Sequence, residues 1–291
     1  VDKNNIIGFV LIAAVLIGFS VWSQPSAEER AAAARQDSIA AVTQQKAIEA
    51  QKAAEQKKAA EAKAAVEADS TALFHKALQG KDSAVVLKND KLELTIGTKG
   101  ATVEKAVIKN FTDREGNPDV TLFDKKDQSL KFMLAAKETN INSDDLYFQA
   151  TGTSDSTATF TAVAGEGKTI TVSYRLGKDY MLHMQLRASG LQGLFAPNTN
   201  TMDIAWEDMC RQQEKGFMFE NRYTTLTYHF ADGGAKNLSE TGEDDKTIDE
   251  KTDWIAFKNQ FFSAVMIAKS DFEANANLKS KPQEKGSGYL K

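Results

Sequence analysis

The strongest constraint on this chain is an uninterrupted apolar run near its start, IIGFVLIAAVLIGFSVW, from Ile6 to Trp22. The run has no charged side chain, and a helix of about 17 residues at ~1.5 Å per residue covers roughly 26 Å, at the short end of what crosses a hydrocarbon core. Such a helix satisfies its own backbone hydrogen bonds inside lipid. The sequence therefore predicts a transmembrane anchor at residues 1–24, which contacts the lipid bilayer through Ile6 to Trp22.

A cleaved secretory signal is the alternative explanation of this run. The run is longer than a usual signal core, and the residues Ser23–Ser26 after it give no clear A-x-A cleavage site. An uncleaved signal-anchor is therefore favoured. A lipoprotein is excluded because no cysteine lies near the run, and neither a signal nor an anchor fits a cytoplasmic protein. The flanking charges do not decide the orientation, since Lys3 precedes the run and charges of both signs follow it.

A low-complexity segment, residues 25–80, follows the predicted anchor. Its main block, Ser26–Ala68, is dominated by alanine with acidic and basic side chains in equal number, and it has no glycine, proline or aromatic residue. Ser26 and Glu29 form the S-x-x-E pattern of a helix start. Large aliphatic residues are too few to form a continuous apolar seam. The segment is therefore predicted to be a solvated helical spacer, with a coiled coil as the sharper alternative.

From Ala84 onward the apolar residues alternate with polar ones, which is typical of half-buried antiparallel strands. Turn signals rich in Gly, Pro, Asn and Asp separate the alternating stretches. Many short strands without a long amphipathic helix indicate a mainly β fold, an all-β sandwich, over residues 84–291. The clearest alternating stretches are Leu92–Ile96, Ala158–Ala162, Ile170–Leu176, Leu182–Leu186 and Leu226–Phe230.

One later segment, Trp254–Ala268 (WIAFKNQFFSAVMIA), is nearly continuously apolar. It is too short and too polar to be a second membrane span. It is predicted to form two central strands, or one bent strand, buried on both faces. Trp206, Trp254 and the sixteen phenylalanines are likewise predicted to lie in the core.

The composition points away from several classes of function. The net charge is −4, which does not suggest a nucleic-acid partner. The single cysteine, Cys210, rules out an internal disulfide and is predicted to be a small buried side chain, because the sequence places no base beside it.

No catalytic, cofactor-binding or metal-binding residue is predicted. The three histidines, His75, His183 and His229, are expected at the surface, because strand parity alone does not bring them together with a carboxylate. The acidic stretch Glu240–Glu250 fails the spacing of a calcium-binding loop and is predicted to be a solvated loop.

Three features, in this order, carry a resemblance to a known family. The first is the amino-terminal anchor with its Ala/Gln/Lys tether, the second is Asn89–Val103 (NDKLELTIGTKGATV), and the third is Trp254–Phe262 (WIAFKNQFF). Lys168–Met184 is a weaker match. Together they resemble the N-terminal half of the YidC/Oxa1/Alb3 family of membrane protein insertases.

This resemblance implies a protein of the bacterial inner membrane that crosses it once, with its N-terminus in the cytoplasm and most of the chain in the periplasm. It implies a β-supersandwich domain, similar to galactose mutarotase-like sugar-binding domains, at residues 84–291. It also implies a non-enzymatic role in inserting and folding membrane proteins, with the Sec translocon and nascent membrane proteins as partners. In this family the insertase activity belongs to a five-helix membrane core, which this chain does not reach before Lys291. The β domain is therefore expected to be truncated at its C-terminus, and no insertase residue can be transferred.

Two alternatives from other classes stay open. One is a membrane-tethered domain that binds or epimerises a carbohydrate, and the other is a structural adaptor that acts through the Ala-rich helix. The sequence also leaves open which face of the β domain binds partners and whether a cleft takes sugar or peptide.

Overall fold

The computed structural model describes residues 57, 73–136, 140–195 and 201–291. The chain divides into two compact units, Val1–Ala65 and Val66–Lys291, and the folded body belongs to the second. The predicted anchor at residues 1–24 and most of the predicted spacer at 25–80 lie outside the described residues. Within the described part, no helix has both the length and the apolar character that a membrane crossing requires.

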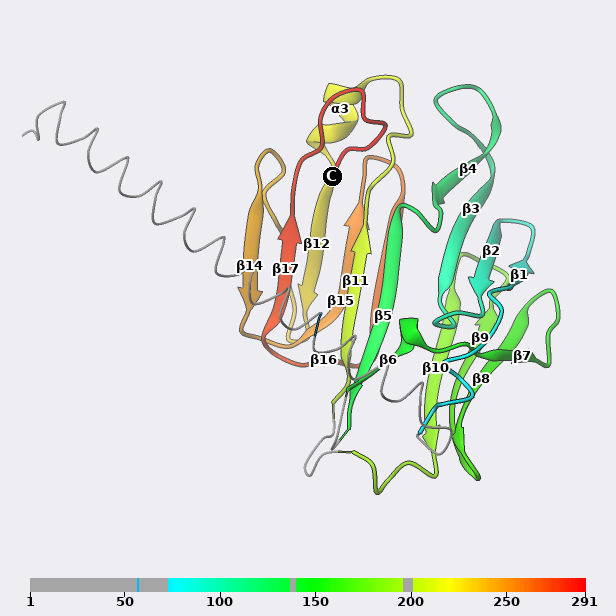
Figure 1. Ribbon diagram of the computed structural model, residues 1–291. Coiled ribbons are helices and arrows are strands. Elements are labelled where there is room, and N and C mark those ends of the chain that lie inside the picture. The colour runs from blue at the N-terminus through cyan, green and yellow to red at the C-terminus, as the bar shows by residue number, and fades with distance from the viewer. Residues whose placement is uncertain (1–56, 58–72, 137–139, 196–200) are drawn as a thin grey trace, which may run out of the picture. The chain divides into compact units, whose positions relative to one another are not determined.

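The body is mainly β, as the alternating sequence predicts, and every strand pair in it is antiparallel. Two four-stranded sheets, coloured from cyan to green in Figure 1, have the orders β1-β2-β3-β4 and β10-β9-β8-β7. Their strands are β1 (Ala84–Lys88), β2 (Leu92–Gly97), β3 (Val103–Thr112), β4 (Pro118–Phe123), β7 (Gln149–Thr151), β8 (Thr157–Gly165), β9 (Lys168–Leu176) and β10 (Leu182–Ser189).

Three further sheets come mostly from the later part of the chain (Figure 1). Their orders are β11-β5-β6, β13-β12-β15-β16 and β14-β17. Between residues 73 and 291, the described part of the chain has two further elements, the short helices η1 (Ser143–Asp145) and α3 (Phe217–Arg222). The strands are β5 (Gln128–Ala135), β6 (Asn140–Asn142), β11 (Asp203–Asp208), β12 (Thr225–Phe230), β13 (Ala235–Asn237), β14 (Asp244–Ile248), β15 (Thr252–Lys258), β16 (Ser263–Phe272) and β17 (Ala276–Ser280).

The β8–β9 hairpin shows how sequence alternation produces a half-buried sheet. Phe160, Ile170 and Val172 are completely buried, and each contributes about 1.5–3 kcal/mol by leaving water. The residues that alternate with them along each strand point to the other face of the sheet, where the hydroxyl of Thr159 lies 3.3 Å from that of Ser173. Period-two alternation therefore separates an apolar face from a polar one.

Glycine is required where the chain leaves β10 and returns to the β8–β9 turn. Gly190 has a φ of +69°, and a Cβ there would lie 2.2 Å from the carbonyl oxygen of Gly167. No side chain fits this approach. The end of β10 can therefore rest directly on the hairpin turn.

Two separate clusters of buried side chains stabilise the body. The larger cluster is built mainly by the first two sheets and includes Leu87, Ile96, Phe160 and Val172. The smaller cluster is built by β12, β14 and β17 and the chain between β13 and β14, and it contains Leu226, Tyr228, Phe230, Leu238, Ile248 and Leu278. Each cluster therefore joins sheets that are not paired with each other strand to strand.

The folded body begins before Ala84. Residues 73–79, which the sequence assigns to the helical spacer, form turns instead. Phe74 and Ala77 are buried in the larger cluster, and the amide of Tyr147 donates a 2.6 Å hydrogen bond to the carbonyl of Ala77. The described end of the predicted spacer is thus packed core, because Phe74 adds apolar surface that a solvated helix would leave in water.

The segment Trp254–Ala268 does form two strands, but the prediction that it is buried on both faces is wrong. β15 is an inner strand, whereas β16 lies at the edge of its sheet. Val265 and Ile267 on β16 are 50% and 56% exposed. Apolar content alone cannot distinguish a central strand from an edge strand.

We expect Phe160→Ala to destabilise the body by about 3–5 kcal/mol, because it leaves a cavity in the larger cluster. Phe261→Ala, at a phenylalanine that is 65% exposed, should cost about 0.5 kcal/mol or less. Urea unfolding followed by tryptophan fluorescence measures both. Equal losses in the two variants would contradict the assignment of the core.

Candidate functional site

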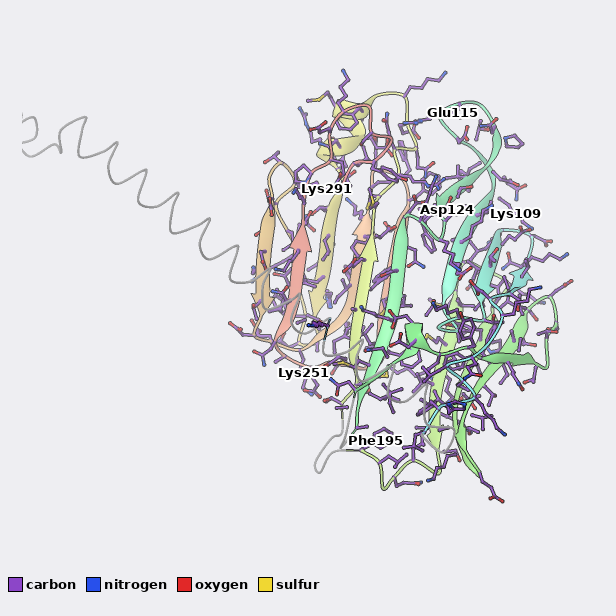
Figure 2. The ribbon with its side chains drawn as sticks, in the orientation of Figure 1. Lys109, Glu115, Asp124, Phe195, Lys251 and Lys291 are labelled. Carbon is purple, nitrogen blue, oxygen red and sulfur yellow. The ribbon has the colours of Figure 1, made fainter. Side chains whose placement is uncertain are left out.

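Three segments that are distant in sequence meet at one end of the body and enclose a hollow of about 350 Å³. They are the turn between β3 and β4, the segment that leads into α3, and the turn between β15 and β16. Figure 1 shows α3 and the β3–β4 turn at the same end, and Figure 2 places Glu115 at the tip of that turn. The lining residues are Asp113, Arg114, Glu214, Lys215, Gly216, Phe219, Gln260 and Phe261.

Large apolar side chains are exposed around this hollow, which we call the aromatic hollow. Phe219 and Phe261, which line it, are 57% and 65% exposed, and Met218, which precedes Phe219 in α3, is 71% exposed. Phe219 packs edge-on against the ring of Tyr223, with 5.5 Å between the ring centroids. Exposed apolar groups gathered at one place are characteristic of binding surfaces. The prediction that all phenylalanines lie in the core is therefore wrong for Phe111, Phe219 and Phe261.

A buried carboxylate fixes the segment that carries Phe219. Glu220 is almost fully buried, and its carboxylate accepts hydrogen bonds from the backbone amides of Gln213, at 3.0 Å, and Glu214, at 2.9 Å. Desolvation raises the pKa of Glu220, against the lowering effect of these hydrogen bonds. The Glu220 carboxylate therefore holds the loop before α3 against the helix, and this fixes the position of Phe219.

An asparagine turn sets the opposite wall of the hollow. The side-chain oxygen of Asn259 accepts hydrogen bonds from the amides of Phe261, at 3.1 Å, and Phe262, at 2.8 Å. Phe262 turns inward and meets Phe111 edge-on, with 5.6 Å between ring centroids. Two adjacent phenylalanines in a tight turn cannot both face the core, so Phe261 is left outside. That dipeptide is the sequence signal that could have located the site.

The rim of the aromatic hollow carries charges of both signs. Arg114 and Lys215 are basic, and Asp113 and Glu214 are acidic. Among the described residues that line the hollow there is no histidine, cysteine or serine. Aromatic walls with a mixed polar rim are suited to binding an apolar side chain whose backbone stays hydrated.

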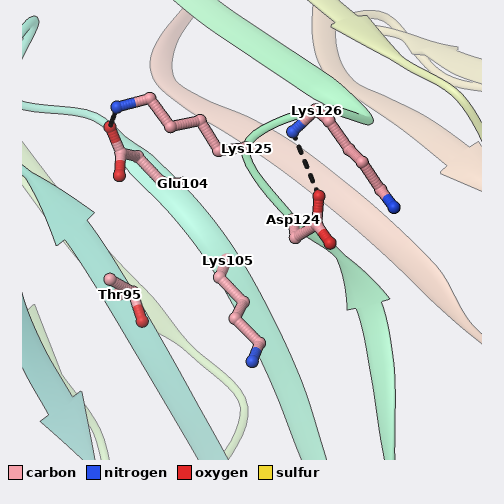
Figure 3. Close-up of a pocket in the computed structure, with 6 residues that line it drawn as sticks. All are labelled: Thr95, Glu104, Lys105, Asp124, Lys125 and Lys126. Atoms are coloured by element: carbon pink, nitrogen blue, oxygen red, sulfur yellow. Dashed lines mark hydrogen bonds and ion pairs between the residues drawn. The ribbon is translucent and has the colours of Figure 1, made fainter.

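A second and larger hollow, of about 510 Å³, lies beside the turn between β4 and β5. It is lined by Thr95, Glu104, Lys105, Asp124, Lys125 and Lys126 (Figure 3). The ammonium group of Lys125 lies 2.6 Å from Asp82 and 2.7 Å from Glu104. The hydrogen bond from Lys125 holds the pKa of Asp82 below its usual value. Lys125 is therefore engaged in joining two segments.

A buried ion pair lies under the same turn. The side chain of Asp127 is completely buried, and it accepts hydrogen bonds from Arg211 and from the hydroxyl of Tyr289, each at 2.6 Å. Arg211 also donates to Asp124. Burial raises the pKa of Asp127, but the bonds from Tyr289 and Arg211 outweigh it, so the pKa lies below its ordinary value. The ion pairs of Arg211 with Asp124 and Asp127 therefore join the β4–β5 turn to the chain after β11.

Asp208 lies near this ion pair without a comparable partner. In the described part of the chain its Oδ1 atom is buried and accepts no hydrogen bond. Desolvation, reinforced by the negative charge of Asp127, raises the pKa of Asp208 to about 7. Asp208 is therefore largely protonated below neutral pH, whereas Asp127 stays ionised.

The histidines are not brought together. His75 lies in the turn before β1, His183 is exposed on β10, and His229 lies on β12. The prediction of a surface position is confirmed for the exposed His183, whereas His229 is only half-exposed and its Nδ1 lies 2.8 Å from Asp253. Its ring also stacks on that of Trp254 at a centroid distance of 5.5 Å. Strand pairing brings these residues together, which parity within a single strand does not reveal.

The other two candidates have structural explanations. Cys210 is buried as predicted, and desolvation raises the pKa of its thiol far above the usual value. The acidic stretch is only partly a loop, because Asp244–Ile248 pairs with β17 as β14 and buries Ile248. The prediction of a solvated loop missed this strand because Ile248 is its only large apolar residue. No group of three or more candidate metal ligands occurs among the described residues.

Comparison with known proteins places the body in a family. Residues 84–290 match the family model described as the YidC periplasmic domain. The chain belongs to the YidC family. The matched range covers β1 to β17, the residues that line both hollows and the ion pair of Asp127.

Curated relatives from several bacteria carry the name membrane protein insertase YidC. The relative from Phocaeicola vulgatus is 43% identical over 100% of this chain and 46% of its own length. Those from Bacteroides fragilis and Porphyromonas gingivalis strain W83 are 41% and 32% identical, each over 100% of this chain and 47% of their own length. The chain thus spans about half the length of the YidC relatives it matches.

We expect Arg211→Met to destabilise the body by about 3–5 kcal/mol, because it leaves the buried carboxylate of Asp127 without its charged partner. The control is Lys251→Met, which removes the exposed ion pair between Lys251 and Glu273 and should cost about 0–1 kcal/mol. Figure 2 shows Lys251 at the end of the body opposite Glu115. Similar losses in the two variants, measured by urea unfolding, would contradict a structural role for the buried pair.

Asp208 makes stability depend on pH. Its pKa is about 7 in the folded body, against an ordinary value of 3.8 for an aspartate in water, so the folded state binds more protons between these limits. The stability that the protonated Asp208 contributes is fully present below about pH 4. It is lost as pH rises towards 7, and the free energy of unfolding falls by at most about 1.4 kcal/mol per pH unit. We expect Asp208→Asn to gain stability relative to the parent chain between pH 5 and pH 8. A difference in unfolding free energy that does not change with pH would show that Asp208 titrates normally.

Proposed function

We propose that this chain is the N-terminal part of a YidC-type membrane protein insertase. Residues 1–24 would anchor it in the bacterial inner membrane with the N-terminus in the cytoplasm, residues 25–80 would form the spacer, and residues 84–291 would form the periplasmic domain. The turns at 73–79 then belong to the folded body rather than to the spacer. Membership of the YidC family and the apolar run from Ile6 to Trp22 support this arrangement.

We further propose that the periplasmic domain is a β-supersandwich. Antiparallel sheets that are not paired with each other but bury common apolar clusters support this architecture. The larger cluster joins the first two sheets, and the smaller cluster joins β12 to the β14–β17 pair.

The role we propose for the periplasmic domain is to dock chains that are being inserted, or subunits of the Sec translocon. The observation that carries this role is the aromatic hollow, where Phe219 and Phe261 are exposed in a concavity with a mixed-charge rim and the exposed Met218 lies next to Phe219 in α3. Aromatic and methionine side chains are enriched at protein-binding surfaces. The proposed role is binding, because the aromatic side chains that line the hollow can pack against an apolar group of a partner.

Site-specific photocrosslinking tests this role. The photoreactive residue benzoylphenylalanine is placed at position 218 in the membrane-embedded protein while a membrane protein is synthesised with a radioactive label. We expect crosslinks to the labelled chain, or to an identified translocon subunit. The matched control is position 180, because Tyr180 is 50% exposed and lies before β10, far along the chain from the hollow. Crosslinking at position 218 no stronger than at position 180 would contradict a docking role.

A loss-of-function variant gives an independent measure. Phe219→Ser together with Phe261→Ser should lower the yield of the crosslink at position 218 by about tenfold or more, because two anchoring aromatics contribute roughly 1 kcal/mol or more each. Both side chains are exposed, so the melting temperature should stay within a few degrees of the parent. Tyr180→Ser serves as the control, and an unchanged yield in the double variant would remove these residues from the docking surface.

Carbohydrate binding is the second candidate, and one observation favours it. The imidazole of His229 is held by Asp253 at 2.8 Å and stacked on Trp254, which supplies a polar and an aromatic group at one place. A ligand that binds the folded state alone must raise the melting temperature. A monosaccharide panel at millimolar concentration that stabilises the parent chain but not His229→Ala would support this candidate, and no stabilisation would exclude it for the sugars tested.

A further inference from the structure

β16 is an edge strand whose first half lacks the usual protection. Among the described residues it pairs with β15 alone, at the end of the order β13-β12-β15-β16. The stretch Ser263–Ala268 has no charged side chain, and Val265 and Ile267 are exposed on it. Native edge strands are commonly protected by charges, proline or a bulge. On β16 the charges begin at Lys269, and the register shift lies beyond Trp254↔Ile267.

Two other edge strands of the body carry polar or charged side chains. β10 carries His183, Gln185 and Arg187, and β11 carries acidic residues at Asp203 and Glu207. The regular pairing from Lys258↔Ser263 to Trp254↔Ile267 leaves the first half of β16 free of any bulge. Its outward amide and carbonyl groups are therefore presented in the alternating order that another extended backbone can match.

The unprotected edge begins at the aromatic hollow. Phe261, which lines the hollow, lies two residues before Ser263. Since a strand rises about 3.3 Å per residue, a chain paired with Ser263–Ala268 needs only a few more residues to reach the hollow. A volume of about 350 Å³ accommodates a large apolar side chain. One bound segment can therefore use both features together.

We propose that the first half of β16, Ser263–Ala268, binds an extended apolar segment of a non-native polypeptide as an added strand, and that the aromatic hollow receives a large side chain of the same segment. The proposal rests on the docking role proposed above and specifies the form of the bound chain. An edge of backbone donors and acceptors is matched by an extended chain, whereas a helix has satisfied its own backbone groups and a lipid chain has none to offer. Val265 and Ile267 would contact alternate side chains of the bound segment.

Hydrogen exchange on the 291-residue chain in lipid nanodiscs tests the proposal. The probe is a synthetic peptide of about twelve residues, with an apolar centre rich in valine and phenylalanine and lysines at both ends for solubility. Mass spectrometry follows amide exchange in residues 263–268, and fluorescence anisotropy of a labelled copy gives the affinity. We expect the peptide to slow exchange in this stretch, because strand pairing protects the outward amides.

Charged variants supply the matched comparison. Val265→Lys with Ile267→Lys should weaken peptide binding by about tenfold or more, since the added charges reproduce the protection found on natural edges. Val86→Lys is the control, because Val86 is an exposed apolar residue on the edge strand β1, and it should leave the affinity unchanged. Unchanged melting temperatures show that all the variants fold.

Each other outcome overturns the proposal in a different way. If the peptide binds equally well to the β16 variants without protecting residues 263–268, strand addition is wrong while docking stands. If no variant and no parent chain binds the peptide, both strand addition and the docking of non-native chains are wrong. If residues 263–268 are protected by the nanodisc lipid before peptide is added, the edge faces the bilayer and the proposed occupant is wrong.

Discussion

The buried carboxylate of Asp127 is the interaction on which the aromatic end of the body depends. With Arg211 and Tyr289 it joins three places in the chain, the β4–β5 turn, the segment after β11 and the last residues before Lys291. The segment after β11 continues into the loop that Glu220 folds around α3. A charged group is costly to bury, but once paired it fixes this segment at a single position. The location of Phe219 therefore follows from an ion pair that does not line the hollow.

The same end of the body combines two features that a soluble domain usually avoids, exposed aromatic side chains and an unprotected sheet edge. Each is a hazard for aggregation when it stands alone. Asn259 holds the turn that carries Phe261 and leads into β16, and Glu220 holds the segment that carries Phe219. The aromatic side chains and the start of the sheet edge are therefore fixed by hydrogen bonds. A domain that meets polypeptides before they fold would need such a surface, and the other edge strands compared with it, β10 and β11, carry polar or charged side chains.

Much of the fold could be predicted from the sequence, but little of the site. Alternation placed the strands around Leu92, Phe160, Ile170 and Leu226, because period-two burial is a local property of the chain. It could not show that β16 is an edge strand, since edge and centre differ in their neighbours rather than in their residues. It also could not show that Asp127, Arg211 and Tyr289 meet, or that His229 lies beside Asp253, because these contacts depend on pairing between distant segments. The one sequence signal for the exposed Phe261 is its place beside a second phenylalanine in a turn.

The central claim is that an unfolded chain docks in extended form at the aromatic end, and disulfide mapping tests it most directly. A cysteine at position 261 of the membrane-embedded protein is oxidised against single cysteines placed one by one along a stalled nascent membrane protein. The account predicts disulfides at every second position of a short apolar stretch of the nascent chain, because a paired strand presents alternate side chains to one face. Disulfides at three- or four-residue intervals would indicate a bound helix. A disulfide yield no higher than that of a control cysteine at position 180 would show that this end of the body does not contact the nascent chain. Either result would contradict the account.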